Sequence, residues 1–172
     1  MTTWHLLLRA ANLGGRNKIA MADLRRILTD LGHEDVTTFL NSGNARFASA
    51  KRSAKTIATD VEAAITGELG LSLRACVRSN DQLRTALDGV PADLDGYVVI
   101  VFLFDKPKPA ALRELLDRDW SPVVVRGNDQ VLYISYRPGG AHSSKLQNSL
   151  LEKLLGVGCT ARTPATIAKM LA

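Results

Sequence analysis

The spacing of apolar side chains along the first part of the chain predicts alternating strands and helices. A nearly continuous apolar run over residues 3–10 is typical of a strand at the centre of a sheet. Over residues 21–31, apolar positions recur at helical spacing and charged residues occupy the other face, which predicts an amphipathic helix. Residues 35–48 read as a hairpin in which Gly43 and Asn44 adopt positive φ at the turn.

The following segments complete a β-α-β-β-α-β order. Apolar side chains recur in steps of four over residues 53–69, which predicts a helix, and residues 71–78 alternate as a strand does. A short helix over residues 80–87 is expected to start with a capping box formed by Ser79 and Gln82.

The second half of the chain repeats this order after a boundary rich in Gly, Pro and Asp at residues 88–96. Gly127 and Asn128 are expected at a hairpin turn, and the spacing of Ser144 and Gln147 predicts another capping box. The expected elements are a strand at 97–104, a helix that starts near Pro109, a hairpin over 121–136, a helix over 143–156, a strand at 157–162 and a last helix over 163–172.

The repeated order predicts an α+β fold of two tandem ferredoxin-like (βαββαβ) units, each with a mainly antiparallel sheet and its helices on one face. The units are expected at residues 1–79 and 97–172, the second with a C-terminal helix, and residues 80–96 form a helix and linker between them. One larger continuous sheet in a single compact globule is the alternative.

Composition narrows the class of protein. With 172 residues, 46% of them hydrophobic, the chain can fill a substantial core. The 22 Lys and Arg against 17 Asp and Glu give a net charge of +5, which favours anionic partners such as phosphates, nucleotides or nucleic acid. No segment has the pattern of a signal peptide or the length of a membrane span, so we predict a cytoplasmic protein without membrane association.

Cysteines and histidines give no sign of a metal centre or a disulfide framework. Cys76 and Cys159 lack CxxC spacing, and the three histidines are scattered, so neither a metal nor another cofactor is predicted. Arg74, Cys76 and Arg78 share one strand face, where two guanidinium groups would make a thiol more reactive. Such a face is more commonly solvated or packed against a neighbour.

The stretch LLLRAANLGGRNKIAM, residues 6–21, is the first candidate binding segment. Backbone N–H groups at Gly14 and Gly15 and the dipole of the following helix could hold an anion, with Arg16 and Lys18 beside them. The spacing fits neither GxGxxG nor GxxxxGK[ST], so both nucleotide-binding fingerprints are absent. A β-α connection in which the glycines only supply unusual backbone angles explains the same residues.

Two further segments have a related composition. NSGN, residues 41–44, places amide and hydroxyl groups at a hairpin tip, although a tight turn requires the same residues. RPGGAHSSKL, residues 137–146, places a second double glycine before a predicted helix start, where capping by Ser144 is the simpler interpretation. Whether these loops lie at one end of a sheet is not decided by the sequence. The candidate anion-binding residues are Arg9, Asn12, Gly14, Gly15, Arg16, Asn17, Lys18, Ser42, Gly43, Asn44, Ser143, Ser144 and Lys145.

Several of these motifs occur together in one pattern: LLRAANLGGRNK, then MADLRRILTDLG, then SGN, and later SKL. This pattern resembles the bacterial family called domain of unknown function 1697, in which the opening reads like LLRGINVGG and is followed by KMADLR and YLQSGN. The chain departs from it at Ala10 and Ala11, where the family has Gly-Ile, and at RTPAT, residues 162–166, where the family has an RNWNT-like segment. The resemblance implies a shared fold and surface without a known reaction.

These observations favour a cytosolic binding domain for a phosphate-containing anionic small molecule. A nucleic-acid-binding module is an alternative based on the net charge of +5, although 5% aromatic residues and the absence of an RNP-like cluster disfavour an RNA-recognition motif. A second alternative is an enzyme whose reaction the sequence does not assign. Exposed sheet edges leave a homodimer as an open alternative.

Overall fold

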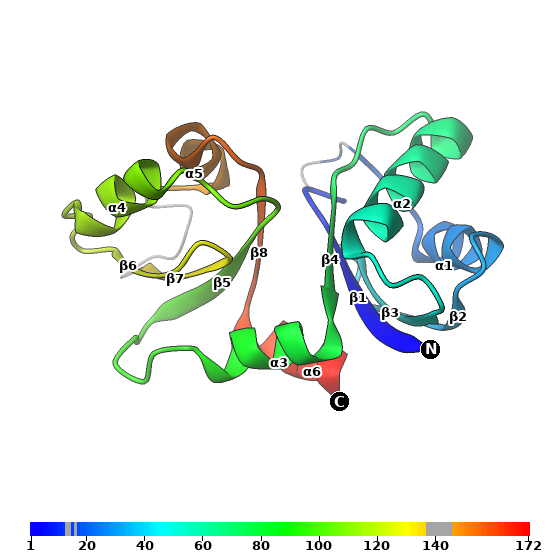
Figure 1. The fold of residues 1–172 in the computed structure, drawn as a ribbon, viewed down its shortest axis with the longest axis horizontal. Helices are drawn as coiled ribbons and strands as arrows, with labels where there is room; N and C mark the ends of the chain where they lie inside the picture. Colours follow the sequence, from blue (N-terminus) through cyan, green and yellow to red (C-terminus); the bar gives the residue numbers. More distant parts are fainter. Residues whose placement is uncertain (13–14, 16, 137–145) are drawn as a thin grey trace. The chain divides into compact units, whose positions relative to one another are not determined.

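Residues 1–12, 15, 17–136 and 146–172 are described by a computed structural model of the chain (Figure 1). Over these residues the fold is α+β, with two antiparallel four-stranded sheets and six helices. The chain divides into two compact units, Met1–Arg84 together with Lys169–Ala172, and Thr85–Ala168. Within the described part of the chain, no helix is both long enough and apolar enough to cross a membrane.

The first unit contains, in chain order, β1 (Thr2–Leu8), α1 (Met21–Asp30), β2 (Glu34–Phe39), β3 (Asn44–Ser49), α2 (Ala54–Leu69), β4 (Ala75–Ser79) and the start of α3 (Asn80–Asp88). Its strands pair in the order β2-β3-β1-β4, and every pair is antiparallel. Helices α1 and α2 lie on the same side of this sheet and enclose the apolar core with it (Figure 1). Because side chains alternate along a strand, Leu6 and Leu8 of β1 enter this core and Leu7 is buried on the other face.

Local sequence sets the helix ends in this unit. The Ser53 hydroxyl accepts a hydrogen bond from the Thr56 N–H at 3.2 Å and caps α2, which ends at Gly70 in the left-handed conformation. The predicted capping box is confirmed, since Ser79 N–H donates to Gln82 Oε1 at 2.9 Å and Gln82 N–H donates to Ser79 Oγ at 3.2 Å.

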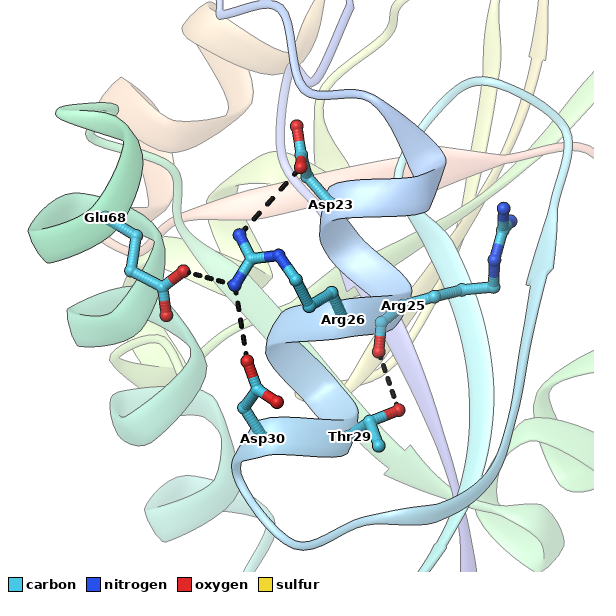
Figure 2. A network of polar contacts seen from close by, with 6 residues as sticks. All are labelled: Asp23, Arg25, Arg26, Thr29, Asp30 and Glu68. Atoms are coloured by element: carbon cyan, nitrogen blue, oxygen red, sulfur yellow. Dashed lines mark hydrogen bonds and ion pairs between the residues drawn. The ribbon is translucent and has the colours of Figure 1, made fainter.

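A network of charged side chains links α1 to α2 (Figure 2). The guanidinium of Arg26 lies 2.7 Å from the Glu68 carboxylate on α2 and 3.3 Å and 3.8 Å from Asp30 and Asp23 on its own helix. The hydrogen bond and charge of Glu68 raise the pKa of Arg26 above its ordinary value. All four side chains are well exposed, so solvent screens the network and the packing of the two helices rests mainly on their apolar faces.

The second unit contains, in chain order, the end of α3, then β5 (Tyr97–Leu103), α4 (Pro109–Asp117), β6 (Val124–Gly127), β7 (Val131–Tyr136), α5 (Asn148–Leu155), β8 (Cys159–Arg162) and most of α6 (Pro164–Leu171). Its strand order, β6-β7-β5-β8, is the same as that of the first sheet when the strands of each unit are counted in chain order. Helices α4 and α5 contribute Leu115, Leu151 and Leu155 to a separate core. The α+β class predicted from the sequence is therefore confirmed.

Two details of the prediction are wrong. Gly43 has the expected positive φ, but Asn44 begins β3, and Leu40 is the other left-handed residue at the turn. Asn44 stays in the strand because its side-chain amide donates to the Phe39 carbonyl and to Ser42 Oγ and so closes the hairpin from there.

The helix predicted over residues 143–156 begins instead at Asn148, with Gln147 as its N-cap in extended conformation, and Ser144 of the predicted capping box lies outside the described residues. The reason lies in tertiary packing. Leu146 is buried, and its carbonyl accepts a hydrogen bond from the Tyr136 hydroxyl at 2.6 Å. Leu146, whose carbonyl is held by a tyrosine on β7, and Gln147 therefore precede the helix.

Candidate anion-binding site

Three segments meet at one end of the first sheet. They are the β1–α1 loop, residues 9–20, the β2–β3 turn, residues 40–43, and the start of β4. Leu8 N–H donates to the Gly43 carbonyl and Arg9 N–H donates to the Arg74 carbonyl, both at 2.9 Å. Because β1 runs antiparallel to β3 and β4, the end of β1 lies beside the beginnings of both neighbours. The first and second candidate segments of the sequence therefore lie together.

Gly43 lets the β2–β3 turn approach the end of β1 closely. Its φ is +76°, and a Cβ atom at this position would lie 2.7 Å from Leu8 Cβ and 3.0 Å from Ala11 Cβ. Glycine is the residue that meets both the conformational and the spatial requirement. The glycine of the NSGN motif thus has a packing role, which brings the turn backbone against the loop.

The side chain of Asn12 joins the β1–α1 loop to the β2–β3 turn. Its Nδ2 donates to the Ile19 carbonyl and to the Asn41 carbonyl, each at 3.0 Å, and lies 3.2 Å from Asn41 Oδ1. Its Oδ1 accepts from Ile19 N–H at 2.8 Å, while its own N–H donates to the Asn17 carbonyl at 3.1 Å. We call the contacts of Asn12 with Ile19 and Asn41 the Asn12 bridge. They close the loop on itself and fix it to the turn.

Left-handed backbone is concentrated in the same two segments. Of the five non-glycine residues with positive φ in the described part of the chain, four lie here: Ala10, Asn12, Asn17 and Leu40, at +58°, +57°, +51° and +57°. Such a conformation costs roughly 1–2 kcal/mol for a residue with a Cβ and persists only where the surroundings enforce it. Backbone strain of this kind clusters at binding sites.

The loop and the turn at this end of the sheet contain basic residues and no acidic ones. Arg9 is half-buried and Lys18 is exposed. Arg74 on the adjacent segment lies 3.4 Å from Glu62, which neutralises part of its charge. Arg9 and Lys18 are the described cationic residues of the β1–α1 loop itself.

Helix α1 adds favourable potential, because it begins directly after the loop. Its N-cap is Ala20, which has no side chain able to accept a hydrogen bond from the first-turn N–H groups. An anion near a helix N-terminus is stabilised by these N–H groups and by the helix dipole. The loop, the turn and the helix start together form a surface suited to an anion.

The predicted residues have different roles in the structure. Asn12, Asn17, Gly15 and Lys18 belong to the loop, and Ser42 and Asn44 are engaged within the hairpin. Asn44 is fully buried, so it stabilises the turn rather than facing a ligand. The candidate residues outside the described part of the chain are Gly14, Arg16, Ser143, Ser144 and Lys145.

Asn41 and Arg74 are part of this arrangement, but the sequence interpretation did not include them in the site. Asn41 precedes Ser42 directly, so the NSGN motif contained its signal. Arg74 is joined to Arg9 only through the pairing of β1 with β4, whose strands lie more than sixty residues apart in the sequence. Its position follows from sheet topology.

The strand face that carries Cys76 gives its thiol little access to solvent. Cys76 is 2% exposed, and both cysteines of the chain are buried without a disulfide. Among the described residues, no cluster of three or more His, Cys, Asp or Glu side chains could hold a metal ion.

A pocket of about 550 Å³ lies at the other end of the first sheet, where Thr3 and Arg46 line it together with the start of α3. In the first turn of α3 the Gln82 N–H already donates to Ser79 Oγ, and Asp81 brings a negative charge to the pocket. Arg46 donates to the carbonyls of Met170 and Ala172. This end of the sheet is therefore less suited to an anion than the end that carries the Asn12 bridge.

These features place the chain in one structural class: an α+β protein of two four-stranded antiparallel sheets with a glycine-containing loop after the first strand. The chain belongs to the family "Protein of unknown function (DUF1697)", whose model matches residues 1–133, including the whole β1–α1 loop and β2–β3 turn.

Solved structures with the same fold include one from a bacterium. The chain is similar to the conserved bacterial protein SP0830 from Streptococcus pneumoniae, with 23% identity over 99% of each chain and a TM-score of 0.75. Because the sequence identity is only 23%, this similarity establishes a shared fold and nothing about function. No curated protein matches the sequence.

Proposed function

We propose that the chain is a cytosolic binding domain for a phosphate-containing anionic small molecule, which binds where the β1–α1 loop meets the β2–β3 turn. The observation that carries the proposal is the Asn12 bridge, which joins two acid-free segments next to Arg9, Lys18 and the N-terminus of α1. A connection that needed only to join a strand to a helix would not require a side chain that fixes it to a second loop.

The chemistry of the segments supports phosphate as the anion. Backbone N–H groups in turns that contain left-handed residues form concave sites for phosphate oxygens, and lysine and arginine add charge-assisted hydrogen bonds. The β1–α1 loop contains left-handed residues at Asn12, Gly15 and Asn17 and a cation at each end, Arg9 and Lys18. The net charge of +5 favours the approach of any anion over long distances.

We further propose that each unit is a ferredoxin-like βαββαβ module and that the chain arose by duplication. The identical strand order of the two sheets, with all pairs antiparallel, supports this arrangement. The cytosolic location is supported by two cysteines that are both buried and form no disulfide.

Calorimetric titration at low salt with inorganic phosphate, pyrophosphate and ADP tests the binding function. We expect at least one of these to bind, and Lys18→Ala to weaken it by about ten- to a hundredfold, since a hydrogen bond between charged groups contributes about 1.5–3 kcal/mol. The matched control is Lys55→Ala, which removes the same charge from an exposed lysine on α2 at the other end of the sheet. Binding by none of the three probes, or equal losses in both variants, would contradict the proposal.

Titration with single-stranded DNA in the same assay distinguishes nucleic-acid binding from the proposed binding of a small phosphate. Non-specific binding to a polyanion depends on total charge and falls steeply with salt. If DNA binds more tightly than the small phosphates and both lysine variants weaken it alike, the nucleic-acid function replaces the one proposed.

A further inference from the structure

We propose that the pocket beside the start of α3, separate from the anion site, binds a small zwitterion of the amino acid type. Its volume of about 550 Å³ lies in the range of small-molecule sites, and all the residues that line it belong to the first unit. We call it the α3 pocket. Arg46 of β3 supplies a positive charge for the carboxylate of the ligand, and Asp81 of α3 supplies a negative charge for its ammonium group. The other lining residues are Met1, Thr2, Thr3, Ser79 and Asn80.

The two charged side chains of the α3 pocket do not neutralise each other. Among the described residues, neither Arg46 nor Asp81 forms an ion pair with another side chain, although both line the same pocket. A simple anion would be repelled by Asp81, and a simple cation would be repelled by Arg46. A ligand that carries both charges gains a charge-assisted hydrogen bond at each end. The pocket therefore favours a zwitterion.

The guanidinium of Arg46 is held in place on one side and open on the other. Its Nη1 donates to the carbonyls of Met170 and Ala172, and its Cζ lies over the Phe39 ring, 5.5 Å from the centroid. Its Nε and Nη2 have no hydrogen-bond partner among the described residues. These two atoms form a fork that binds a carboxylate through two parallel hydrogen bonds. Because the group is already fixed, little side-chain entropy is lost on binding.

A buried histidine orients the amide of Asn80 in the wall of the α3 pocket. His5 Nε2 lies 3.1 Å from Asn80 Oδ1, and since an amide oxygen only accepts, Nε2 is the donor. The oxygen of the amide is thus engaged. Both hydrogens of Asn80 Nδ2, which have no partner in the described part of the chain, are left for a ligand carboxylate.

The other ring nitrogen of His5 is a second sign of a ligand at this place. His5 lies on the same face of β1 as Thr3 and directly opposite Arg46 on β3, and both of these neighbours line the pocket. Burial lowers the pKa of His5 against the hydrogen bond of Asn80, and the charge of Arg46 lowers it further, so the ring is neutral at neutral pH. Its Nδ1 is then a fully buried acceptor without a partner among the described residues. Such an atom is typical of sites that a water or a ligand completes.

NMR titration of the full chain with L-glutamine tests the site, since the hydroxyls of Thr2 and Thr3 suit a polar ligand side chain. Two analogues each lack one charge: glutaramate has no ammonium group, and L-glutaminamide has no carboxylate. We expect L-glutamine to shift the backbone amide signals of Asn80 and Asp81. It should bind at least about tenfold more tightly than either analogue, because each analogue loses a charge-assisted hydrogen bond.

The substitution Asp81→Asn shows whether this carboxylate binds the ammonium group. The preference for L-glutamine over glutaramate should fall to less than about twofold, whereas a merely structural effect would weaken both probes alike. Asp88→Asn is the matched control, because it removes the same charge from an exposed position at the other end of α3 and should leave the preference unchanged. No binding of L-glutamine, equal binding of the three probes, or the same preference in Asp81→Asn as in the wild type would overturn the proposal.

Discussion

Gly43 shows how one residue determines the geometry of the site. A Cβ atom there would overlap Leu8 and press on Ala11, so the turn could no longer lie against the end of β1. Gly70 has a similar φ, +65°, but a Cβ atom at that position would meet nothing within 4 Å. Alanine substitutions at the two glycines therefore distinguish the free-energy cost of close packing from the cost of the left-handed backbone.

We expect Gly43→Ala to lower the free energy of unfolding by about 2–4 kcal/mol, because it adds overpacking to backbone strain. Gly70→Ala should cost only about 1 kcal/mol, the backbone component. Urea denaturation of both variants measures the difference. Equal losses would show that the approach of the turn to β1 is not sterically limited.

Among the secondary-structure elements, α1 is the helix whose start lies at the proposed site, and no side chain caps it. Ala20 offers no acceptor to the first-turn N–H groups. A polar N-cap stabilises a helix by about 1 kcal/mol. Ser53 caps α2 and Ser79 caps α3 in this way, whereas α1 has no such cap. Helices α4 and α5 also begin without a side-chain capping bond, so the uncapped start is a shared feature, and at α1 the proposed anion would contact these N–H groups.

The substitution Ala20→Ser should raise the free energy of unfolding by about 0.5–1 kcal/mol and weaken pyrophosphate binding several-fold, since the new hydroxyl competes for the same N–H groups. Gln147→Ser at the N-cap of α5, which also lacks a side-chain capping bond, is the matched control. It should stabilise the chain without a change in affinity. A gain in stability and unchanged affinity for Ala20→Ser would remove the helix start from the site.

For the molecule as a whole, acid stability depends on two buried histidines. His33 is 3% exposed and stacks on Phe47 with ring centroids 4.5 Å apart, and neither of its ring nitrogens has a hydrogen-bond partner among the described residues. Burial lowers the pKa of His33, and Lys51 lowers it further, against an opposing effect of Asp60.

Burial also lowers the pKa of His5, although the hydrogen bond to Asn80 raises it in part. Both histidines thus favour the neutral form in the folded state. Their contribution to stability is complete above the ordinary histidine pKa of about 6.5. It is lost as the pH falls from there through the lower folded values, because the unfolded chain then binds more protons.

We expect the free energy of unfolding of the wild type to fall between pH 7.5 and pH 5.5, with each histidine contributing at most about 1.4 kcal/mol per pH unit. His33→Gln should unfold more easily at pH 7.5 but show a shallower dependence on pH. Urea denaturation at several pH values measures both slopes. Identical slopes would mean that His33 is protonated equally in the folded and unfolded chain.

Much of the fold could be predicted from the sequence because it depends on local signals. The apolar spacing of residues 21–31 gives α1, and Ser79 with Gln82 gives the start of α3, since both depend on neighbours a few residues away. The start of α5 could not be predicted, because a hydroxyl from β7 holds the Leu146 carbonyl. The left-handed conformation expected for Asn44 is wrong for a similar reason, as its side-chain bonds and not its residue type place it in β3.

For the site, the order of residues alone establishes which chemical groups are present: a double glycine, asparagines and cations without acidic residues between β1 and α1. Only the folded sheet brings this loop, the β2–β3 turn and Arg74 together. Because β1 runs antiparallel to β3 and β4, the end of β1 and the starts of its two neighbours lie at the same end of the sheet. Hydrogen bonds such as that of Asn12 to Asn41 form across 29 residues, and no local pattern encodes a contact of that range.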